Sequence, residues 1–449
     1  MTAEQDTIFA LSTPPGRGGI AVLRLSGPGA GAALRALAGS ALPAPRRATL
    51  ATFRDPESGA EIDRGLALWF PGPGSFTGED LAELHLHGGR AVVAAAAAAL
   101  GRLPGLRVAE PGEFTRRAFD GGKLDLAEVE GLADLINAET EAQRRVALRQ
   151  LSGSLSRVVE DLRRRLTETA ARLEAWIDFP EEDLPEGLGE QVAGSLGALL
   201  EEMRPYLSPE HHAERLREGL MVAILGAPNV GKSSLMNALA RRDVAIVSET
   251  AGTTRDVIEV HLDLRGYPLT LADTAGLRAR ETETGDPIEA EGIARALARA
   301  RSADLRLVVL DASQDPAAQE ETFGLIEAES LVVANKCDLA PPPGRAGGHE
   351  VLPVSAKTGA GLEPLLERLG QEAEALLGLG AVAAPLTRER HREALAECAA
   401  ALERARDASL PELRAEDLRL GLRALGRIVG RVDVEQLLDV IFSEFCIGK

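Results

Sequence analysis

The eight residues from Gly226 to Ser233 have the types and spacing of a phosphate-binding loop. They read Gly226-Ala227-Pro228-Asn229-Val230-Gly231-Lys232-Ser233 and fit the pattern Gly-x-x-x-x-Gly-Lys-Ser. Glycines let backbone N–H groups face phosphate oxygens, and the helix that follows offers its positive N-terminal end. Lys232 can reach the β- and γ-phosphates, and the Ser233 hydroxyl can ligate Mg²⁺. The pattern predicts a nucleotide site that uses magnesium.

Two segments further along the chain indicate that the base is guanine. Asn335-Lys336-Cys337-Asp338 ends an apolar run, and a carboxylate there can accept from the N1–H and exocyclic amine that guanine presents. Ser355-Ala356-Lys357 ends the next run and is expected to close over the base. Asp273-Thr274-Ala275-Gly276 follows a third run, which puts Asp273 near Mg²⁺ and the Gly276 N–H near the γ-phosphate.

The lysines of this chain are few and are concentrated at these motifs. Among 50 lysines and arginines, only five are lysine: Lys123, Lys232, Lys336, Lys357 and Lys449. Because a compact ammonium and a planar guanidinium are not interchangeable, the lysines should mark positions that need an ammonium. Three of them belong to the expected guanine-nucleotide site. Lys123 and Lys449 remain, far apart in the sequence, as candidates for a second site.

Strands that end at the motifs must position these residues. Alternating Ile258, Val260, Leu262 and Leu264 and a turn at 265–268 predict a hairpin. The second strand of this hairpin is expected at 269–272. Apolar runs, which predict buried strands, occur at 220–225, 307–310, 331–334 and 351–354. Helical patterns separate the later runs. Alternating strands and helices predict a mostly parallel sheet that is covered on both faces.

The flanking sequence differs in character from this α/β segment. Short strand patterns at 7–11, 19–25, 65–70 and 81–87 alternate with Ala-rich helical stretches, which predicts an α+β domain. Amphipathic helical patterns cover 124–177, 190–217 and the residues after about 380 through Phe445. We therefore expect an α+β domain at 1–119, a helical domain in two parts at 120–217 and 380–449, and an α/β domain inserted at 218–379.

Composition narrows the class of protein. The 449 residues include 69 acidic and 50 basic ones, a formal net charge of −19, which argues against a broad nucleic-acid-binding surface but leaves partner-assisted RNA contact open. Three cysteines cannot build a disulfide framework or a cysteine-rich zinc site. The first residues lack the basic start of a secretory signal, and the longest apolar run, 91–100, is about half of a membrane span. A cytoplasmic protein is expected.

The motifs resemble those of the translation-factor-like P-loop GTPases. Together with Thr253-Thr254-Arg255-Asp256 they resemble the MnmE (TrmE) family of tRNA uridine-modification GTPases. The resemblance extends to the segments from Gly18 to Arg24, Phe76-Thr77-Gly78-Glu79-Asp80, His87-Gly88-Gly89, Pro111-Gly112-Glu113-Phe114-Thr115, Gly122-Lys123-Leu124-Asp125-Leu126 and Phe445-Cys446-Ile447-Gly448-Lys449. It implies an N-terminal tetrahydrofolate-binding-like α+β domain, a helical domain and an inserted Ras-like P-loop GTPase domain.

The resemblance also implies a set of nucleotide and metal contacts. GTP would be contacted by Asn229, Val230, Gly231, Lys232, Ser233, Ser234, Ser248, Glu249, Thr250, Ala251, Gly252, Thr253, Thr254, Asp273, Thr274, Ala275, Gly276, Asn335, Lys336, Cys337, Asp338, Ser355, Ala356 and Lys357. Ser233 and Thr254 would ligate Mg²⁺. A potassium ion would replace an arginine finger, with Asn229, Ser248, Thr250 and Thr253 as ligands. The family often has Thr-Asp where this chain has Ser248-Glu249, so backbone ligation is retained and side-chain ligation is in question.

Hydrolysis needs a group that orients the attacking water. Leu277 follows Gly276, where many small GTPases have a glutamine, and an apolar side chain cannot orient water. The resemblance gives this duty to Glu289, with Glu291 close by as the alternative. The other interpretation of Glu289 is a solvated carboxylate at the start of a helix.

The resemblance assigns a one-carbon site to the N-terminal domain. Arg24, Glu83, Lys123 and Lys449 match positions that contact a formyl- or methylene-tetrahydrofolate. A pterin ring can pair with a carboxylate as guanine does, and a glutamate tail needs cations. The apolar end of the chain, 441–447, should be tied down rather than frayed. Cys446 would then be a nucleophile or an acid beside the folate carbon unit, or a buried inert thiol.

His85 and His87 lie two residues apart, so on one strand they would face the same way. This spacing permits metal binding, but no third ligand is visible, which favours a structural or hydrogen-bonded role.

The leading hypothesis is a potassium-dependent GTP hydrolase that acts in tRNA modification. By resemblance it would form a homodimer whose GTPase domains meet face to face, and a heterotetramer with an FAD-dependent partner of the MnmG family. The complex would add a carboxymethylaminomethyl or aminomethyl group to carbon 5 of wobble uridine in certain tRNAs, with a one-carbon unit from tetrahydrofolate. One alternative is a ribosome-assembly or other RNA-associated regulatory GTPase, which should carry a basic RNA-binding module. A dimerising scaffold, which predicts no folate binding, is another.

Overall fold

The computed structural model describes residues 6–39, 41–178, 188–207, 212–242, 244–246, 259–273, 303–377 and 386–432, together with Leu438, Ile441, Phe442, Phe445 and Gly448. The chain divides into two compact units. The first contains 1–133, 150–200 and 394–449, and the second contains 134–149 and 201–393. This division is coarser than the boundaries expected at 119, 217 and 379, which remain a proposal. None of the helices in the described ranges is both long and apolar enough to cross a membrane.

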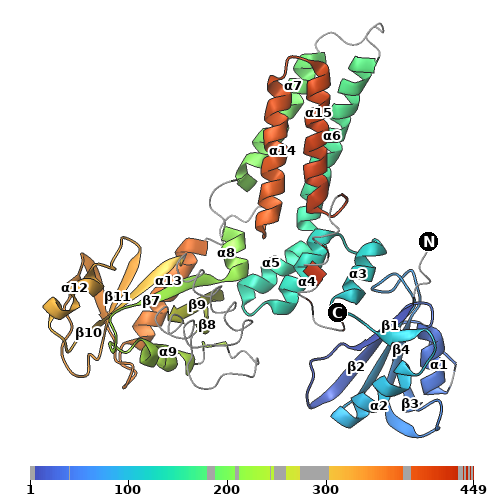
Figure 1. The fold of residues 1–449 in the computed structure, drawn as a ribbon, viewed down its shortest axis with the longest axis horizontal. Helices are drawn as coiled ribbons and strands as arrows, with labels where there is room; N and C mark the ends of the chain where they lie inside the picture. Colours follow the sequence, from blue (N-terminus) through green and yellow to red (C-terminus); the bar gives the residue numbers. More distant parts are fainter. Residues whose placement is uncertain are drawn as a thin grey trace, which may run out of the picture. The chain divides into compact units, whose positions relative to one another are not determined.

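A six-stranded sheet forms the N-terminal part of the first unit (Figure 1). Its strands are β1 (Thr7–Leu11), β2 (Gly18–Ser26), β3 (Thr49–Arg54), β4 (Glu61–Phe70), β5 (Leu81–Gly88) and β6 (Leu106–Val108), in the order β3-β4-β5-β2-β1-β6. The four expected strands are confirmed, whereas β3 and β6 were not predicted. Both are mostly exposed, so they lack the apolar alternation that reveals a half-buried strand.

The two faces of this sheet have different environments. Helices α1 (Ala30–Ala38) and α2 (Arg90–Gly101) cover one face, where Leu23 and Leu25 of β2 are buried in a common core with both helices. Because side chains alternate along a strand, Arg24 and Ser26 point to the opposite face. Phe114 of helix α3 (Glu113–Asp120) packs on that face with Ile8 and Ala10.

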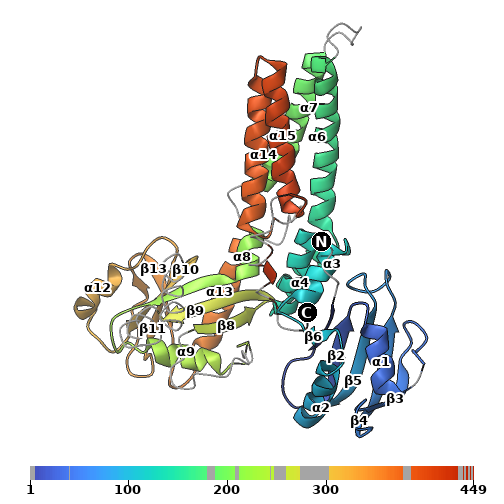
Figure 2. The same cartoon turned by 45° about the vertical axis from the view of Figure 1, so that its right-hand side comes forward.

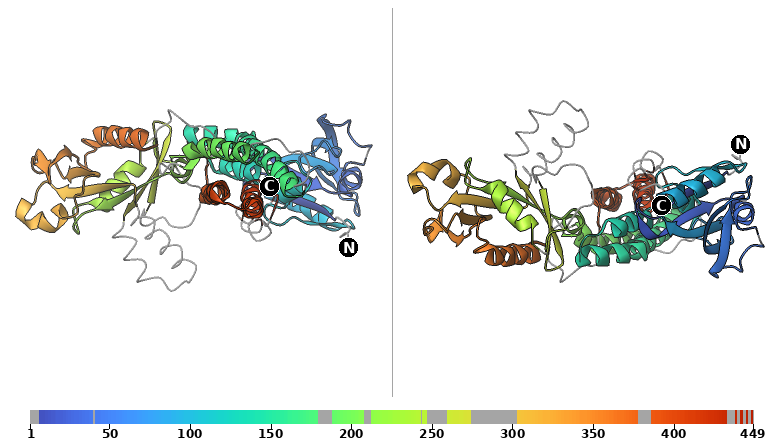
Figure 3. Two further views of the ribbon diagram at one scale, coloured as in Figure 1. Left: turned by 90° about the horizontal axis from the view of Figure 1, so that it is seen from above. Right: turned by 90° about the horizontal axis from the view of Figure 1, so that it is seen from below.

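Long helices form the rest of the first unit. Their bounds are α4 (Leu126–Asn137), α6 (Ser154–Asp178), α7 (Leu188–Met203), α14 (Glu389–Asp407) and α15 (Pro411–Ile428), whereas α5 (Glu141–Leu151) lies almost entirely in the second unit. Figures 1 and 2 show α6, α7, α14 and α15 side by side as a bundle, and Figure 3 shows the same grouping from above and below. A Cβ at Gly421 of α15 would lie 2.9 Å from Leu402 of α14 and 3.3 Å from Leu166 of α6, so glycine allows close packing here.

The helical stretch expected over 190–217 is interrupted. Helix α7 ends at Met203 and is followed by a 3₁₀ turn at Arg204–Leu207 and then by α8 (His212–Glu218). Pro205 lies in that turn, and proline lacks the N–H that a continuing α-helix requires.

The second unit contains a seven-stranded sheet in the order β12-β13-β11-β10-β7-β9-β8. The strands are β7 (Leu220–Leu225), β8 (Glu259–Leu264), β9 (Tyr267–Asp273), β10 (Leu305–Asp311), β11 (Ser330–Asn335), β12 (Arg345–Ala346) and β13 (His349–Pro353). The five strands from β13 to β9 are parallel, as expected, and β8 and β12 pair antiparallel at the edges.

Helices cover both faces of the second sheet. Helix α9 (Lys232–Ala240) and helix α13 (Leu362–Leu377) share one core with β7, and Figure 3 shows α13, in dark orange, along the strands. On the other face Leu310 and Val332 pack with Phe323 of α12 (Glu320–Phe323). The expected architecture of a covered, mostly parallel sheet is therefore confirmed.

Candidate functional site

Five strand ends meet at one edge of the second sheet. Because β7, β9, β10, β11 and β13 are parallel and adjacent, their carboxyl ends lie along the same edge. The residues that end or follow these strands are Gly226, Asp273, Asp311, Asn335 and Ser355. Strand β7 lies between β9 and β10, the place in an open α/β sheet where a ligand-binding crevice forms.

The loop between β7 and α9 has the backbone of a phosphate-binding turn. Asn229 and Gly231 both have positive φ, +64° and +95°, and Gly231 caps the N-terminus of α9. Lys232 is buried, and its ammonium donates to the carbonyl oxygens of Gly226 at 2.9 Å and Ala227 at 3.0 Å. The lysine therefore curls over the loop at the N-terminus of the helix, where phosphate oxygens bind.

Ser233 and Asp273 bring two oxygen ligands together beside this loop. The Ser233 hydroxyl donates to Asp273 Oδ2 at 3.1 Å, and the Asp273 side chain is buried. A hydroxyl and a carboxylate at one point suit Mg²⁺, which prefers hard oxygen ligands and keeps several waters. Ser233, a predicted magnesium ligand, and Asp273, which was expected near the ion, thus lie together.

Asn335 ties three segments of the site to one another. It is only 2% exposed. Its side-chain amide donates to the Val230 carbonyl at 2.9 Å, and its amide oxygen accepts from the Ala356 N–H at 3.0 Å. A Cβ at Gly231 would lie 2.3 Å from the Asn335 Nδ2 atom, so the phosphate loop approaches this side chain as closely as glycine allows.

Lys336 contacts the phosphate loop and a carboxylate that sequence reasoning missed. Its ammonium donates to the Asn229 carbonyl at 3.0 Å and to Asp311 Oδ2 at 2.6 Å. Burial raises the pKa of Asp311, but the Lys336 ammonium and the Ser313 hydroxyl and N–H outweigh it, so the pKa lies below its usual value. A signal was present in the sequence, since Asp311 ends an apolar run just as Asp273 and Asn335 do.

Asp338 and Ser355 form the last contact of the site. The Ser355 hydroxyl donates to Asp338 Oδ1 at 2.6 Å and also accepts from the Thr358 N–H at 3.2 Å. The Cys337 N–H donates to the Val354 carbonyl at 3.1 Å, which joins the two base-recognition segments. Within the described ranges no partner bonds to the second carboxylate oxygen of Asp338, which suits it to accept from a ligand.

Several expected residues lie outside the described residues. They are Ser248, Glu249, Thr250, Ala251, Gly252, Thr253, Thr254, Thr274, Ala275, Gly276, Leu277, Glu289, Glu291, Cys446 and Lys449. Asn229, Ser233, Asp273, Asn335 and Ser355 are brought to one edge together with their neighbours in sequence.

A second set of predicted residues meets on the sheet of the first unit. Arg24 and Glu83 are direct partners across β2 and β5, and the guanidinium donates to Glu83 Oε1 at 3.0 and 3.1 Å. The Arg24 guanidinium carbon lies 5.7 Å from the ring centre of Phe76 and 5.9 Å from that of Phe114. A paired ionic group beside aromatic rings is suited to a flat heterocycle.

Lys123 lines a pocket of about 750 Å³ beside this sheet. The Lys123 side chain passes Gly78, where an added Cβ would lie only 3.1 Å from the Lys123 Cε atom. Arg117 lines the same pocket and donates to Glu79, which in turn accepts from the Ser26 hydroxyl at 2.7 Å. Burial raises the pKa of Asp120, another lining residue, more than Arg116 and Arg117 lower it.

His85 and His87, the two histidines of β5, both have carboxylate partners. His85 Nε2 lies 3.1 Å from Glu83 Oε2, and His87 Nδ1 lies 2.9 Å from Asp63 Oδ1. No group of three or more His, Cys, Asp or Glu side chains suited to a metal ion occurs among the residues that the structure describes. The hydrogen-bonded role predicted for both histidines is confirmed.

The end of the chain packs on the first unit. Ile441, Phe442 and Phe445 are buried against Leu126 and neighbouring residues of α4. The Ser12 hydroxyl donates to the Gly448 carbonyl at 2.9 Å. Leu11 pairs with Leu23 of β2, one residue before Arg24. The prediction that the tail is tied down is confirmed for its described residues.

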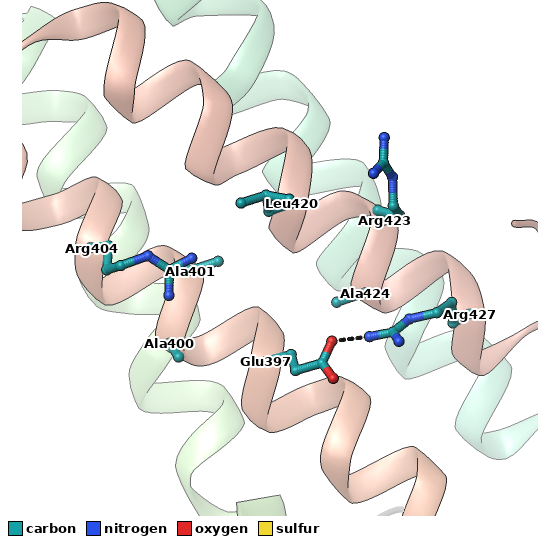
Figure 4. Close-up of a pocket in the computed structure, with 8 residues that line it drawn as sticks. All are labelled: Glu397, Ala400, Ala401, Arg404, Leu420, Arg423, Ala424 and Arg427. Carbon is teal, nitrogen blue, oxygen red and sulfur yellow. Dashed lines mark hydrogen bonds and ion pairs between the residues drawn. The ribbon is translucent and has the colours of Figure 1, made fainter. Parts of the chain in front are cut away.

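Another hollow, of about 450 Å³, lies between α14 and α15 of the bundle (Figure 4). Figure 4 shows the ion pair between Glu397 and Arg427 across it, and Arg404 bonds to Asp417 at 2.9 Å. Two of its three arginines are therefore paired with carboxylates of the same helices, and its other lining residues are alanines and a leucine.

Comparison with known proteins identifies the family. The model described as "MnmE helical domain" matches residues 126–446, and the model described as "GTP-binding protein TrmE N-terminus" matches residues 7–123. The chain is 56% identical to the tRNA modification GTPase MnmE of Paramagnetospirillum magneticum over 99% of this chain and all of that one. It is 55% identical to the MnmE of Rhodospirillum rubrum over 99% of both.

Among solved structures, the G domain of the T. maritima FeoB iron transporter is 29% identical over 34% of this chain and 98% of that one, with a TM-score of 0.24. The two family models and the full-length identities agree with the resemblance carried by the motifs. The chain belongs to the MnmE (TrmE) family.

Proposed function

We propose that this chain is a GTP hydrolase that takes part in tRNA modification. The observation that carries the proposal is the meeting, at one sheet edge, of the phosphate loop with Asn335, Asp338 and Ser355. Membership of the MnmE family, whose curated relatives are named tRNA modification GTPases, supplies the modification half of the proposal.

The base would be read by Asp338 and held by the segment around Ser355. The carboxylate oxygen of Asp338 that does not bond to Ser355 can accept from the N1–H or the exocyclic amine of guanine, and adenine has no N1–H. The buried side chain of Asn335 is bonded to Val230 and Ala356. It therefore fixes the two segments relative to each other at the place where the base would bind.

Hydrolysis would depend on two cations. Ser233 and Thr254 would hold Mg²⁺, with Asp273 beside Ser233, and the bound ion would neutralise charge on the β- and γ-phosphates. K⁺ would be held by Asn229 with Ser248, Thr250 and Thr253. Asn229 has a positive φ of +64°, so the phosphate loop has an unusual backbone conformation at the residue that would hold K⁺. Glu289, or alternatively Glu291, would orient the attacking water.

A reduced folate would bind to the first unit and supply the one-carbon unit. The Arg24–Glu83 pair suits the pterin ring, and Lys123 in the pocket of about 750 Å³ suits the carboxylates of the glutamate tail. Pockets of this size hold molecules of several hundred daltons. The packing of Gly448 beside β1 supports a contribution from Cys446 and Lys449.

The remaining parts of the proposal concern assembly. The chain would act as a cytoplasmic homodimer and join an FAD-dependent partner of the MnmG family in a heterotetramer, with tRNA as the substrate. A net charge of −19 is consistent with a partner that supplies the basic tRNA-binding surface. The product would be a carboxymethylaminomethyl or aminomethyl group at carbon 5 of wobble uridine.

Nucleoside analysis of tRNA tests the overall function. Cells that lack this chain should lose the modified wobble uridine, and cells that carry the chain without Phe445 to Lys449 should lose it too. The truncated chain should nevertheless hydrolyse GTP at nearly the full rate, because the two chemistries occupy separate sites. Unchanged nucleosides in both strains would contradict the proposal.

Calorimetry with 5-formyl-tetrahydrofolate tests the folate site directly. The intact chain should bind it, whereas Lys123→Ala and the truncated chain should bind it at least ten-fold more weakly, as expected for the loss of one charge-assisted contact each. Equal binding by all three chains would mean that the folate site is misplaced.

A further inference from the structure

Asp311 is a carboxylate at the edge of the second sheet that several hydrogen bonds hold in place. It ends β10 directly opposite Asn335 of β11 and is 2% exposed. Its backbone N–H donates to the side-chain oxygen of Gln319 at 2.8 Å, and its carbonyl accepts from the Gln319 amide at 3.0 Å. Its Oδ1 atom accepts from both the N–H and the hydroxyl of Ser313, at 2.9 and 2.6 Å.

The other carboxylate oxygen of Asp311 bonds to Lys336 among the residues that the structure describes. Oδ2 lies 2.6 Å from the Lys336 ammonium, which is partly exposed and also donates to the Asn229 carbonyl. A lysine side chain at such a position has several rotamers available, and ordering it costs free energy. The buried Asp311 carboxylate is held by its own hydrogen bonds, so its bond to the ammonium favours one rotamer of Lys336.

The Lys336 ammonium also links two residues whose backbone conformations are strained. Asn229 and Lys336 are two of four non-glycine residues with positive φ in the described part of the chain. Such conformations are unfavourable for non-glycine residues and persist where surrounding contacts impose them. The bridge from Asp311 through Lys336 to Asn229 is a contact of that kind.

We propose that Asp311 is a positioning residue of the guanine-nucleotide site, which fixes Lys336 against the phosphate loop and thereby slows nucleotide release. The proposal rests on the proposed function as a GTP-binding protein. It predicts that the bridge from Asp311 through Lys336 to Asn229 helps to hold the base-recognition segment against the phosphate loop, beside the bond from Asn335 to Val230. Asp311 acts through Lys336 and Asn229, so its loss should weaken binding without removing any group that chelates Mg²⁺.

The test is the dissociation rate of a fluorescent GDP from the full chain. Asp311→Asn removes the charge but keeps the shape, and dissociation should be about ten-fold faster, as expected when a charge-assisted hydrogen bond is lost. Asp315→Asn is the matched control. Asp315 lies in the same loop, but in the described structure its side chain bonds only to the Ala317 N–H, so the substitution should leave the rate unchanged.

A double-mutant cycle separates positioning from a general structural effect. If Asp311 acts through Lys336, Asp311→Asn combined with Lys336→Met should release GDP no faster than Lys336→Met alone. Additive effects, or a native rate in Asp311→Asn, would overturn the proposal. If Asp311→Asn does not fold, Ser313→Ala decides the matter. It leaves the charge but removes one hydroxyl donor, so release should quicken about two- to three-fold, and a native rate would overturn the proposal.

The same measurement distinguishes failure of this inference from failure of the proposed function. If the unaltered chain does not bind GDP at all, the GTPase assignment is wrong. If the unaltered chain binds GDP and Asp311→Asn releases it at the same rate, only the positioning role of Asp311 is wrong.

Discussion

Replacing Gly231 by alanine would test how tightly the phosphate loop and the base-recognition segment are joined. Two separate costs follow from the structure. Gly231 has a φ of +95°, and an L-residue in the left-handed region costs roughly 1–2 kcal/mol. The added Cβ would also lie 2.3 Å from the Asn335 amide nitrogen, which must then move away from the Val230 carbonyl. Leaving those buried groups unpaired costs about 1–3 kcal/mol more.

Gly359 provides the matched control for this substitution. It also has a positive φ, +82°, in the same unit, but a Cβ there would meet only the end of the Arg242 side chain, at 3.3 Å. Gly359→Ala should therefore show the backbone cost alone, roughly 1–2 kcal/mol. Gly231→Ala should destabilise the second unit by roughly 2–5 kcal/mol in total.

Hydrogen exchange of the full chain without nucleotide would measure both effects. The amides of β7, β10 and β11 pair within the second sheet, so their slowest exchange reports the free energy of opening that unit. Both tryptophans, Trp69 and Trp176, lie in the first unit, and their fluorescence serves as an internal reference that should not change. Equal losses in the two glycine variants would refute the argument that Asn335 joins the segments.

Three further predictions concern the sites directly. Asp338→Asn should weaken GTP and admit xanthosine nucleotides, because the amide reverses the donor–acceptor pattern at the base; tight ATP binding without guanine preference would contradict this. GTP hydrolysis should be much faster in potassium than in sodium at equal ionic strength. Glu289→Ala should lose hydrolysis while keeping GTP binding, and a normal hydrolysis rate in that variant would assign the orientation of the attacking water to Glu291. Burial raises the pKa of the Cys398 thiol to about 12, so at pH 8 a thiol reagent should label the partly exposed Cys337 but not Cys398 until the chain unfolds; early labelling of Cys398 would contradict its burial.

Much of the nucleotide site was predictable because one rule governs its geometry. Parallel strands end at the same edge, so motifs that each follow an apolar run must meet in space. Asp273, Asn335 and Ser355 were identified in this way, and the structure brings them to that edge. The order of the strands was not needed for this conclusion, only their common direction.

Asp311 was not predicted because its role depends on features that no short pattern contains. Its contact with Lys336 requires the register of β10 against β11, which places Asp311 opposite Asn335. It also requires the positive φ of Lys336, which turns that side chain back toward the phosphate loop. In the first unit, β3 was missed for a simpler reason, since only Phe53 of its six residues is buried.

The bundle of the first unit is built from two stretches of chain that a ribosome would produce at very different times. Helix α7 ends at Met203 and α14 begins at Glu389, so at 5–20 residues per second roughly 10–40 s of synthesis would separate them. During that interval Leu166 and the other apolar residues of α6 have neither Leu402 nor Gly421 to pack against. The inserted α/β unit can fold in the meantime, because its sheet is complete by Leu377. The newborn protein should thus present an unfinished apolar surface to chaperones for tens of seconds, and slower translation of the intervening segment should prolong that exposure.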